Sequence, residues 1–282
     1  MKLRIEGAEI FVPDGLEVNA AMARTTHIAF GAHQDDIEMM AYHGVLECYG
    51  LSKKWFAGVT VTNGAGSPRD GVYADYTDAD MQKIRKSEQK KAAIVGDYSF
   101  QGLLDYTSSA VKDGACRDTV EDIKGILLAA KPEVVYTHNL ADKHDTHVSV
   151  ALRVVAALRE LPADARPKSV YGCEVWRDLD WMRDEDKVPL DVSGHENLAA
   201  ALLGVYDSQI AGGKRYDLAC VGRRRANATF FASHGVDVTT QLSLAMDLTP
   251  LVSDSGIDVE KYVTGYISQF AEEISSRLRK LR

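Results

Sequence analysis

The stretch Ala32-His33-Gln34-Asp35-Asp36-Ile37-Glu38 decides how the rest of this chain of 282 residues is interpreted. It follows the apolar run Ile28-Ala29-Phe30, which is typical of a buried strand. Gly31 and Ala32 are small enough to let the chain turn at the strand end. In open parallel α/β sheets, ligands bind beyond the carboxyl ends of the strands. The polar groups of this stretch are therefore expected where such a fold builds its site.

The residue types in this stretch suit a divalent metal. Catalytic zinc takes three protein ligands from His and carboxylate groups and keeps one position for water. His33 and Asp36 are two such ligands, and the adjacent Asp35 points elsewhere and is free to act as a base on the water. The alternative is that Asp35 and Asp36 form the N-cap and first turn of a helix, where acids suit the dipole. The pattern alone leaves both interpretations open.

A second cluster of polar residues follows the β-branched run at residues 134–137. Three histidines and two aspartates fall there within ten residues, namely His138, Asp142, His144, Asp145 and His147. If the two strands are parallel neighbours, their C-terminal ends share one edge of the sheet. His147 then completes a zinc site with His33 and Asp36. The alternative is a group of solvated loop and helix-cap histidines.

Strands and helices alternate along the chain. Apolar runs predict strands near residues 26–32, 55–62, 98–104, 134–137 and 169–176, and an edge strand within 2–12. Helices are predicted from the acid cluster to Gly50 and over about 77–95, 119–130, 147–160, 195–207 and 258–280. This order favours an α/β fold, a Rossmann-like three-layer sandwich with a mostly parallel sheet and helices on both faces.

We expect one domain over residues 1–282. Its C-terminal part, from about 211 to 282, is expected to be an extension. The last helix carries an apolar stripe made of Val263, Ile267, Phe270, Ile274 and Leu278. That stripe is expected to pack on the core or on a neighbouring subunit of a homo-oligomer.

Composition narrows the classes of function. Hydrophobic residues make up 45% and charged residues 26%, as in ordinary globular proteins. The formal net charge of −8 argues against a nucleic-acid partner. The four cysteines are widely spaced, the N-terminus is charged and no apolar run is long enough to cross a bilayer, so we expect a cytoplasmic protein without membrane contact.

Two further features are candidates for substrate contact. The loop 63–71 follows a strand and carries Arg69, which we expect to face the polar end of a substrate, although a plain surface loop is the alternative. A basic set in this acidic chain suits either an anionic substrate group or surface ion pairs. That set consists of Lys214, Arg215, Arg223, Arg224 and Arg225.

The two clusters together resemble the PIG-L / LmbE-like zinc-dependent N-deacetylase family. Its Ala-His-Pro-Asp-Asp-x-Glu motif stands here as residues 32–38, and its Asp-x-His-Pro-Asp-His motif as residues 142–147 after Thr137-His138-Asn139. Two weaker motifs stand as Arg85-Lys86-Ser87-Glu88 and Tyr206-Asp207-Ser208-Gln209. The resemblance spans about residues 26–210.

The resemblance implies a metal-dependent hydrolase that removes an acetyl group from an N-acetylated amino sugar or related amide. Its substrate would be a small molecule, expected to be a sugar conjugate. A zinc-bound water would attack, assisted by Asp35 as the base, and His144 would polarise or protonate near the developing oxyanion. His33, Asp36 and His147 would hold the zinc, and another divalent metal is compatible with these ligands.

The remaining candidates in the second cluster have less definite roles. His138 is expected either to support the site or to face the substrate, and Asp142 is a further candidate for substrate contact.

Two positions depart from the family pattern. Gln34 replaces Pro, and Thr146 replaces the Asp that accompanies the second motif's His, a role that Asp142 or Asp145 could take. These departures keep a catalytically silent protein open as an alternative. A nucleotide-binding Rossmann-like protein is another alternative, against which the missing G-x-G-x-x-G register argues.

Overall fold

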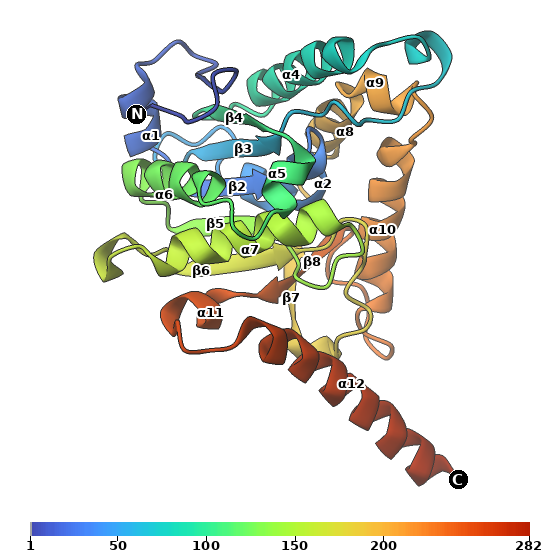
Figure 1. Ribbon diagram of the computed structural model, residues 1–282. Coiled ribbons are helices and arrows are strands. Elements are labelled where there is room, and N and C mark those ends of the chain that lie inside the picture. Colours follow the sequence, from blue (N-terminus) through green and yellow to red (C-terminus); the bar gives the residue numbers. More distant parts are fainter. Residues whose placement is uncertain (1) are drawn as a thin grey trace.

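Within residues 2–282, which this computed structural model describes, an eight-stranded mixed sheet forms the centre of the molecule (Figure 1). The strand order is β1-β4-β3-β2-β5-β6-β8-β7. Strands β4, β3, β2, β5 and β6 are parallel, and β1, β8 and β7 pair antiparallel to their neighbours. The strands are β1 (Glu9–Phe11), β2 (His27–Gly31), β3 (Phe56–Thr62), β4 (Gln101–Tyr106), β5 (Val134–His138), β6 (Ser169–Cys173), β7 (Lys187–Asp191) and β8 (Leu242–Asp247).

Helices cover both faces of the sheet, which confirms the predicted α/β fold. One face carries α1 (Val18–Ala23), α5 (Ser108–Lys112), α6 (Asp118–Ala130), α7 (Asp145–Arg159) and α11 (Thr249–Ser253). The other carries α2 (Asp36–Met40), α3 (Tyr42–Leu46), α4 (Asp78–Val95), α8 (Glu196–Gly204), α9 (Asp207–Ile210) and α10 (Tyr216–Phe230). Short 3-10 turns lie at Gly71–Tyr73, Ala163–Ala165 and Asp184–Asp186.

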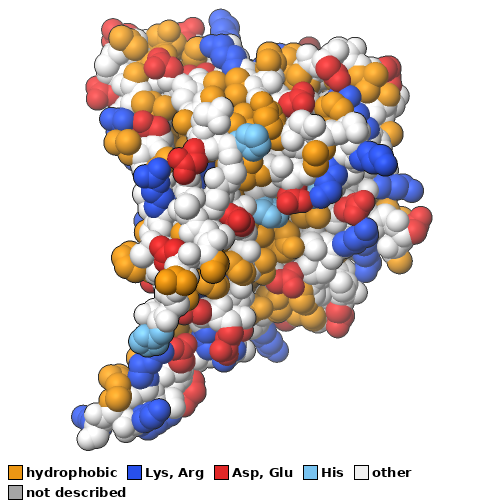
Figure 2. Space-filling view, turned by 180° about the vertical axis from the view of Figure 1, so that it is seen from behind, with side chains coloured by type: hydrophobic (Ala, Val, Ile, Leu, Met, Phe, Trp, Pro, Cys, Tyr) orange, Lys and Arg blue, Asp and Glu red, His pale blue; other side chains and the backbone are white. Residues whose placement is uncertain are grey.

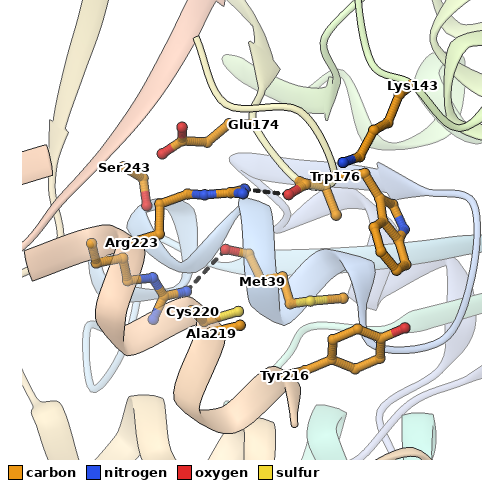
Figure 3. A pocket seen from close by; sticks show the side chains of 11 residues that line it. Met39, Lys143, Glu174, Trp176, Tyr216, Ala219, Cys220, Arg223 and Ser243 are labelled. Carbon is orange, nitrogen blue, oxygen red and sulfur yellow. Dashed lines mark hydrogen bonds between the residues drawn. The ribbon is translucent and has the colours of Figure 1, made fainter. Parts of the chain in front are cut away.

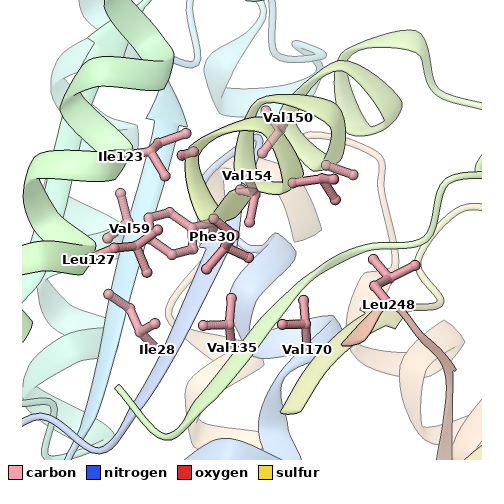
Figure 4. Close-up of a cluster of buried hydrophobic side chains, with 14 of the residues drawn as sticks. Ile28, Phe30, Val59, Ile123, Leu127, Val135, Val150, Val154, Val170 and Leu248 are labelled. Carbon is pink, nitrogen blue, oxygen red and sulfur yellow. The ribbon is translucent and has the colours of Figure 1, made fainter. Parts of the chain in front are cut away.

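The central strands are mostly apolar because both of their faces are buried. Ile28 and Phe30 of β2 belong to the core under α6 and α7, where they lie near Ile123 and Val154 (Figure 4). Ala29, between them in the sequence, belongs to the core on the opposite face. This burial of both faces produces the continuous apolar runs from which the strands were predicted.

The helix predicted from the acid cluster to Gly50 is wrong in one respect, because it is broken at Ala41 (φ −112°, ψ 20°) into α2 and α3. Arg224 of α10 donates from Nη2 to the backbone oxygens of Glu38 (2.9 Å) and Met39 (3.0 Å). In a continuous helix, those oxygens would accept from amides four residues further on. The guanidinium takes the place of these amides and stabilises the break.

The C-terminal part of the chain contains elements that the sequence patterns did not predict. Strand β8 inserts between β6 and β7, and α10 packs on α8 and β8. The last helix, α12 (Val259–Leu281), packs on the body through its first two turns and then projects as an arm (Figures 1 and 2). None of the helices described here combines the length and the hydropathy that a bilayer span requires.

Candidate metal centre

The two polar clusters meet at one edge of the sheet. Strands β2 and β5 are parallel neighbours, with Ile28 opposite Val135. The first cluster follows the end of β2 at Gly31, and the second follows the end of β5 at His138. The prediction that His33, Asp36 and His147 lie together required these two strands to be parallel neighbours, and they are.

Three potential ligand atoms converge closely at this edge. His33 Nδ1 lies 3.2 Å from Asp36 Oδ2 and 3.2 Å from His147 Nε2, and the last two atoms are 3.4 Å apart. Zinc bonds to nitrogen and oxygen are about 2.0–2.2 Å long, so the edges of a tetrahedral site measure roughly 3.3–3.6 Å. The three atoms therefore fit three corners of such a site.

Two more imidazoles stand beside these atoms and could form other ligand sets. His144 groups with His33 and His147, and His138 groups with Asp36 and His147. His138 is fully buried, and its Nε2 accepts a hydrogen bond from the amide of Ala32 (2.9 Å). That bond occupies the lone pair that a metal would need. His138 stacks on His147 with ring centroids 4.0 Å apart, so it lies where it can support the cluster.

Charge at the centre is concentrated on Asp36. Its Oδ2 accepts a hydrogen bond from the amide of His33 (2.6 Å) and lies 3.5 Å from His138 Nε2. Burial opposes ionisation, but His147 and His138 outweigh it and hold the pKa of Asp36 well below its usual range. Burial likewise disfavours the charged form of His147, yet Asp36 raises the pKa of that imidazole. The centre thus favours an ionised carboxylate among nitrogen donors.

Asp35 occupies the N-cap position of α2, but its side chain makes no capping hydrogen bond. Its backbone has φ 99°, an uncommon conformation for a non-glycine residue. Asp35 Oδ2 instead accepts a hydrogen bond from Arg85 Nη2 at 2.9 Å, and both side chains are buried. Burial raises the pKa of Asp35 to about 6, and Arg85 opposes that rise. This environment differs from that of a simple helix cap.

The two weaker motifs also converge on the centre. Arg85 joins Asp35 to Glu88, whose Oε2 lies 3.4 Å from Arg85 Nη1. Glu88 in turn accepts hydrogen bonds from the amide and hydroxyl of Ser208, both at 2.7 Å. The last acid of the opening stretch, Glu38, is bound by Tyr206 (2.6 Å) among other groups. These buried contacts tie α2, α4 and α9 together behind the site.

Asp142 links the centre to its surroundings. Its Oδ1 accepts from the amide of His144 (2.9 Å), and its Oδ2 accepts from the amide of Trp176 (3.1 Å) and lies 3.5 Å from His147 Nδ1. Within residues 2–282, His144 Nδ1 is buried without a hydrogen-bond partner, so Asp142 reaches that residue's backbone rather than its ring. Thr146, which stands where the family pattern has Asp, is buried.

Two other predicted features have definite places. Gln34, which replaces the family's Pro, donates from Nε2 to Thr62 O (3.0 Å) and so tethers the loop to the end of β3. Arg69 forms an ion pair with Asp78 at the start of α4 and donates to Ala65 O (2.7 Å), so its guanidinium is engaged by its own loop and by that helix. A substrate contact by Arg69 stays a prediction.

A cavity of about 300 Å³ lies beside the centre (Figure 3). Its lining includes Lys143, Glu174, Trp176, Tyr216, Cys220 and Arg223. Sequence reasoning missed most of these residues. Trp176 lies just beyond the end of β6, where the strand-end rule could have found it, whereas Tyr216 and Cys220 belong to the unpredicted helix α10.

Comparison with known proteins agrees with this geometry. Residues 28–158 match the family model described as PIG-L: GlcNAc-PI de-N-acetylase. A search of curated proteins finds no match.

Several solved structures share the fold. The 4-carboxy-2-hydroxymuconate hydratase of Pseudomonas putida is 16% identical, with a TM-score of 0.59 over 79% of this chain and 95% of that one. The N,N'-diacetylchitobiose deacetylase of Pyrococcus horikoshii is 15% identical, with a TM-score of 0.58 over 79% and 84%. The zinc-inhibited teicoplanin deacetylase Orf2 is 14% identical, with a TM-score of 0.56 over 78% and 97%. Identities this low demonstrate likeness of fold alone.

Proposed function

Through residues 28–158 this chain belongs to the PIG-L family, and on that premise we propose that it is a zinc-dependent hydrolase that removes an acetyl group from an N-acetylated amino sugar or related amide. The observation that carries the proposal is the convergence of His33, Asp36 and His147, whose ligand atoms are 3.2–3.4 Å apart. Two proteins of the same fold are named as deacetylases of N,N'-diacetylchitobiose and of teicoplanin, which favours an N-acetylated sugar as the substrate.

His33, Asp36 and His147 are the proposed zinc ligands. When bound, zinc lowers the pKa of a water ligand from 15.7 toward about 7. Asp142 faces the other ring nitrogen of His147 at 3.5 Å, the place of the carboxylate that commonly orients a ligating histidine. Asp142 is therefore proposed as a positioning residue.

Asp35 is the proposed general base. Its pKa of about 6 leaves it mostly ionised at neutral pH, close enough to neutrality to accept a proton from water and later return one to the leaving amine. Arg85 holds one of its oxygens and so orients the carboxylate. Burial lowers the pKa of His144, which keeps its imidazole neutral and able to donate a hydrogen bond toward an oxyanion.

Metal content and acetate release test this function together. Protein purified without added metal should contain about one zinc or other divalent ion per chain, because the ligand set is complete within the chain. It should release acetate from N-acetylglucosamine or N,N'-diacetylchitobiose. His33→Ala should lose both properties. A protein without bound metal and without acetate release would contradict the proposal and favour a catalytically silent chain.

A second candidate is the hydration of an unsaturated carboxylic acid, in which water adds to a carbon–carbon double bond. One protein of the same fold is named as such a hydratase, and the cavity beside the centre is lined by cationic side chains that suit a carboxylate. The same base would serve either reaction. Loss of the ultraviolet absorbance of a conjugated acid, without acetate release from any amide, would favour hydration.

A further inference from the structure

The walls of the cavity beside the centre contact the proposed catalytic residues and their neighbours. Trp176, in its wall, donates its amide to Asp142, and its ring stacks near that of His144 with centroids 6.4 Å apart. Lys143 in the lining directly precedes His144, and Met39 donates its amide to the backbone oxygen of Asp35 at 3.1 Å. A molecule that reaches the centre through this cavity therefore has its remaining part against these walls.

The charge of the lining is strongly positive in a chain of net charge −8. Four cations lie in or over the cavity, namely Lys143, Lys214, Arg223 and Arg224. Within residues 2–282, none of the four has a carboxylate oxygen within 4.0 Å, whereas the neighbouring Arg215 and Arg225 do. The single acid among the described lining residues is Glu174, which is buried and accepts hydrogen bonds from the amide of Leu244 (3.1 Å) and from the side chain of Asn227. A set of unpaired cations around a cavity favours a negatively charged ligand.

Two neighbouring arginines of the same basic set form ion pairs with carboxylates, so the lack of ion pairs is confined to the cations at the cavity. Arg225 faces away from it toward Glu196, with 3.6 Å between Nη2 and Oε2. Arg215 is paired with Asp217 at 2.7 Å. Arg223 instead donates to the backbone oxygen of Val175 in the cavity wall, and its charge acts on Glu174 of the same wall, although the two groups are not within ion-pair distance. The basic set of the sequence is thus divided between surface ion pairs and unpaired cations at the cavity.

The walls also favour a flat or ring-shaped body. The rings of Trp176 and Tyr216 are perpendicular to each other, with centroids 6.1 Å apart, and Lys214 Nζ lies 5.1 Å from the centroid of Trp176. Aromatic faces of this kind bury the apolar face of a ligand while cations bind its charged end. Arg224 is buried against α2, whereas Arg223 is half-buried and Lys143 is exposed, so Arg223 and Lys143 are the cations that a ligand can reach most easily.

We propose that this cavity binds a carboxylate or phosphate group of the substrate, so that the enzyme acts on an acidic N-acyl compound in preference to a neutral one. The inference rests on the proposed deacetylation, since it assigns the substrate class of that same site. Arg223 and Lys143 supply the charge, and Trp176 and Tyr216 hold the ring that bears the acidic group.

Three compounds with a common ring test the proposal. N-acetylglucosamine is neutral, N-acetylglucosamine 6-phosphate adds a phosphate, and N-acetylmuramic acid adds a carboxylate. Charge-assisted hydrogen bonds are among the stronger polar contacts, so at least one charged compound should have a kcat/KM about tenfold or more above that of the neutral one. Which of the two is preferred identifies the acidic group. Equal kcat/KM for all three compounds would overturn the proposal.

Variants locate the effect. Arg223→Gln should raise KM for the preferred charged compound about tenfold and leave that for N-acetylglucosamine within about twofold, because only the charged end loses its partner. Arg223→Lys should restore much of the loss, and Lys143→Gln should act in the same direction. Arg225→Gln, on the same helix but outside the lining, is the matched control and should match the wild type. Equal behaviour of Arg223→Gln and Arg225→Gln would contradict the assignment.

Binding measured by calorimetry separates this inference from the proposed function. If the metal-loaded protein hydrolyses none of the three compounds, deacetylation of amino sugars is wrong. Tighter binding of a charged compound, weakened in Arg223→Gln, would still support the acidic-ligand site. Thermal unfolding of each variant shows whether a loss of affinity is caused by impaired folding. If Arg223→Gln is impaired in folding, the affinity of Lys143→Gln for the charged compound decides whether the site is correct.

A separate observation concerns the projecting helix α12. Six apolar residues, Val263, Ile267, Phe270, Ile274, Leu278 and Leu281, recur at intervals of three or four. At about 100° per residue they lie within a sector of roughly 80°. The stripe begins where the helix packs on its own body and continues beyond it, so that Ile267 is 47% and Leu278 is 63% exposed. A helix this long without tertiary contacts along its outer half is marginal by itself.

The charges of α12 favour a second copy of the same helix in antiparallel orientation. Asp258 and Glu260 lie at its start, and Arg279, Lys280 and Arg282 lie at its end. Antiparallel pairing brings the acidic start of one helix to the basic end of the other, and it also opposes the two helix dipoles. We infer that α12 joins two copies of this chain through the apolar stripe.

Light scattering coupled to size-exclusion chromatography tests this contact. The wild type should be at least dimeric at tens of micromolar, and Ile274→Glu should be monomeric because it places a charge in the buried seam. Ser276→Glu adds the same charge on the opposite side of the helix and should keep the wild-type mass. A monomeric wild type, or an Ile274→Glu variant of unchanged mass, would refute the pairing.

Discussion

Replacement of Asp35 by Asn tests the chemistry with the least structural disturbance. Asn has nearly the same shape, it tolerates the positive φ of 99° better than most residues, and its side-chain oxygen can still accept from Arg85. What it loses is the ability to accept a proton. A general base typically contributes about 10²–10⁴-fold to the rate, which corresponds to roughly 2.7–5.5 kcal/mol of activation free energy.

The same replacement has a calculable effect on stability. Burial raises the pKa of Asp35 to about 6 in spite of Arg85, so the ionised carboxylate is less favourable in the folded chain than in the unfolded one. Compared with the ordinary pKa of 3.8, this corresponds to a cost of about 3 kcal/mol at neutral pH, which a neutral Asn does not carry. Arg85 keeps Glu88, whose Oε2 is 3.4 Å away. The free energy of unfolding should therefore stay the same or rise by up to about 3 kcal/mol, and the ligands His33, Asp36 and His147 are not altered.

Three measurements on one preparation decide the outcome. Elemental analysis should give an unchanged metal-to-protein ratio, denaturant unfolding should give an equal or higher stability, and acetate release should give kcat reduced at least about 100-fold. Asp145→Asn, an exposed acid at the start of α7, is the matched control and should retain activity. Full metal content with kcat within about threefold of the wild type would refute Asp35 as the base, whereas loss of metal would place Asp35 among the ligands.

Contacts of single residues support three further predictions. His147→Ala should weaken metal binding by more than the roughly 10–100-fold that is typical when a residue supporting a ligand is lost. Competition with a chelator measures this affinity. An unchanged affinity would remove His147 from the ligand set. Burial lowers the pKa of the His27 imidazole from 6.5 to about 4, so the unfolded chain is protonated before the folded chain as the pH falls. The contribution of His27 to stability is therefore present above pH 6.5 and is lost as the pH falls toward 4. Unfolding free energies measured across that range should fall by up to about 3 kcal/mol for this group, and His27→Gln should flatten the slope; a variant with the wild-type slope would contradict the assignment. Gly44→Ala places a Cβ only 2.6 Å from a ring carbon of Tyr136 and 2.8 Å from one of Phe56, so we expect a loss of about 1–3 kcal/mol by denaturant unfolding, and an unchanged stability would show that the rings move aside freely.

Much of the fold could be predicted because periodicity is local. The strands that became β2, β3 and β5, and the helices that became α4, α6 and α7, were predicted from apolar runs bounded by turn residues. Strands β7 and β8 were missed. Strand β7 alternates buried and exposed positions weakly over five residues and contains Pro189, which argues against a central strand. It lies at the edge of the sheet, where proline is tolerated.

The candidate ligands could be predicted for a related reason. His33 and Asp36 follow one strand and His147 follows another, and parallel neighbouring strands bring their ends to the same edge. Residue type and position after a strand were therefore enough to name the three residues. The competing donor His138 could be set aside only by its burial and by the hydrogen bond that its Nε2 accepts from Ala32, which no sequence pattern contains.

By itself, the sequence determined the α/β class and the residues at the ends of β2 and β5, because both depend on short-range patterns of apolar and polar side chains. Only the tertiary structure decided the break between α2 and α3 and the charge of the cavity. Arg224 stabilises that break from the C-terminal part of the chain, and Lys143, Trp176 and Arg223 meet at the cavity from three separate segments. Such meetings depend on how the elements pack, since residues far apart in the chain are brought together only when their elements bury their apolar faces against one another.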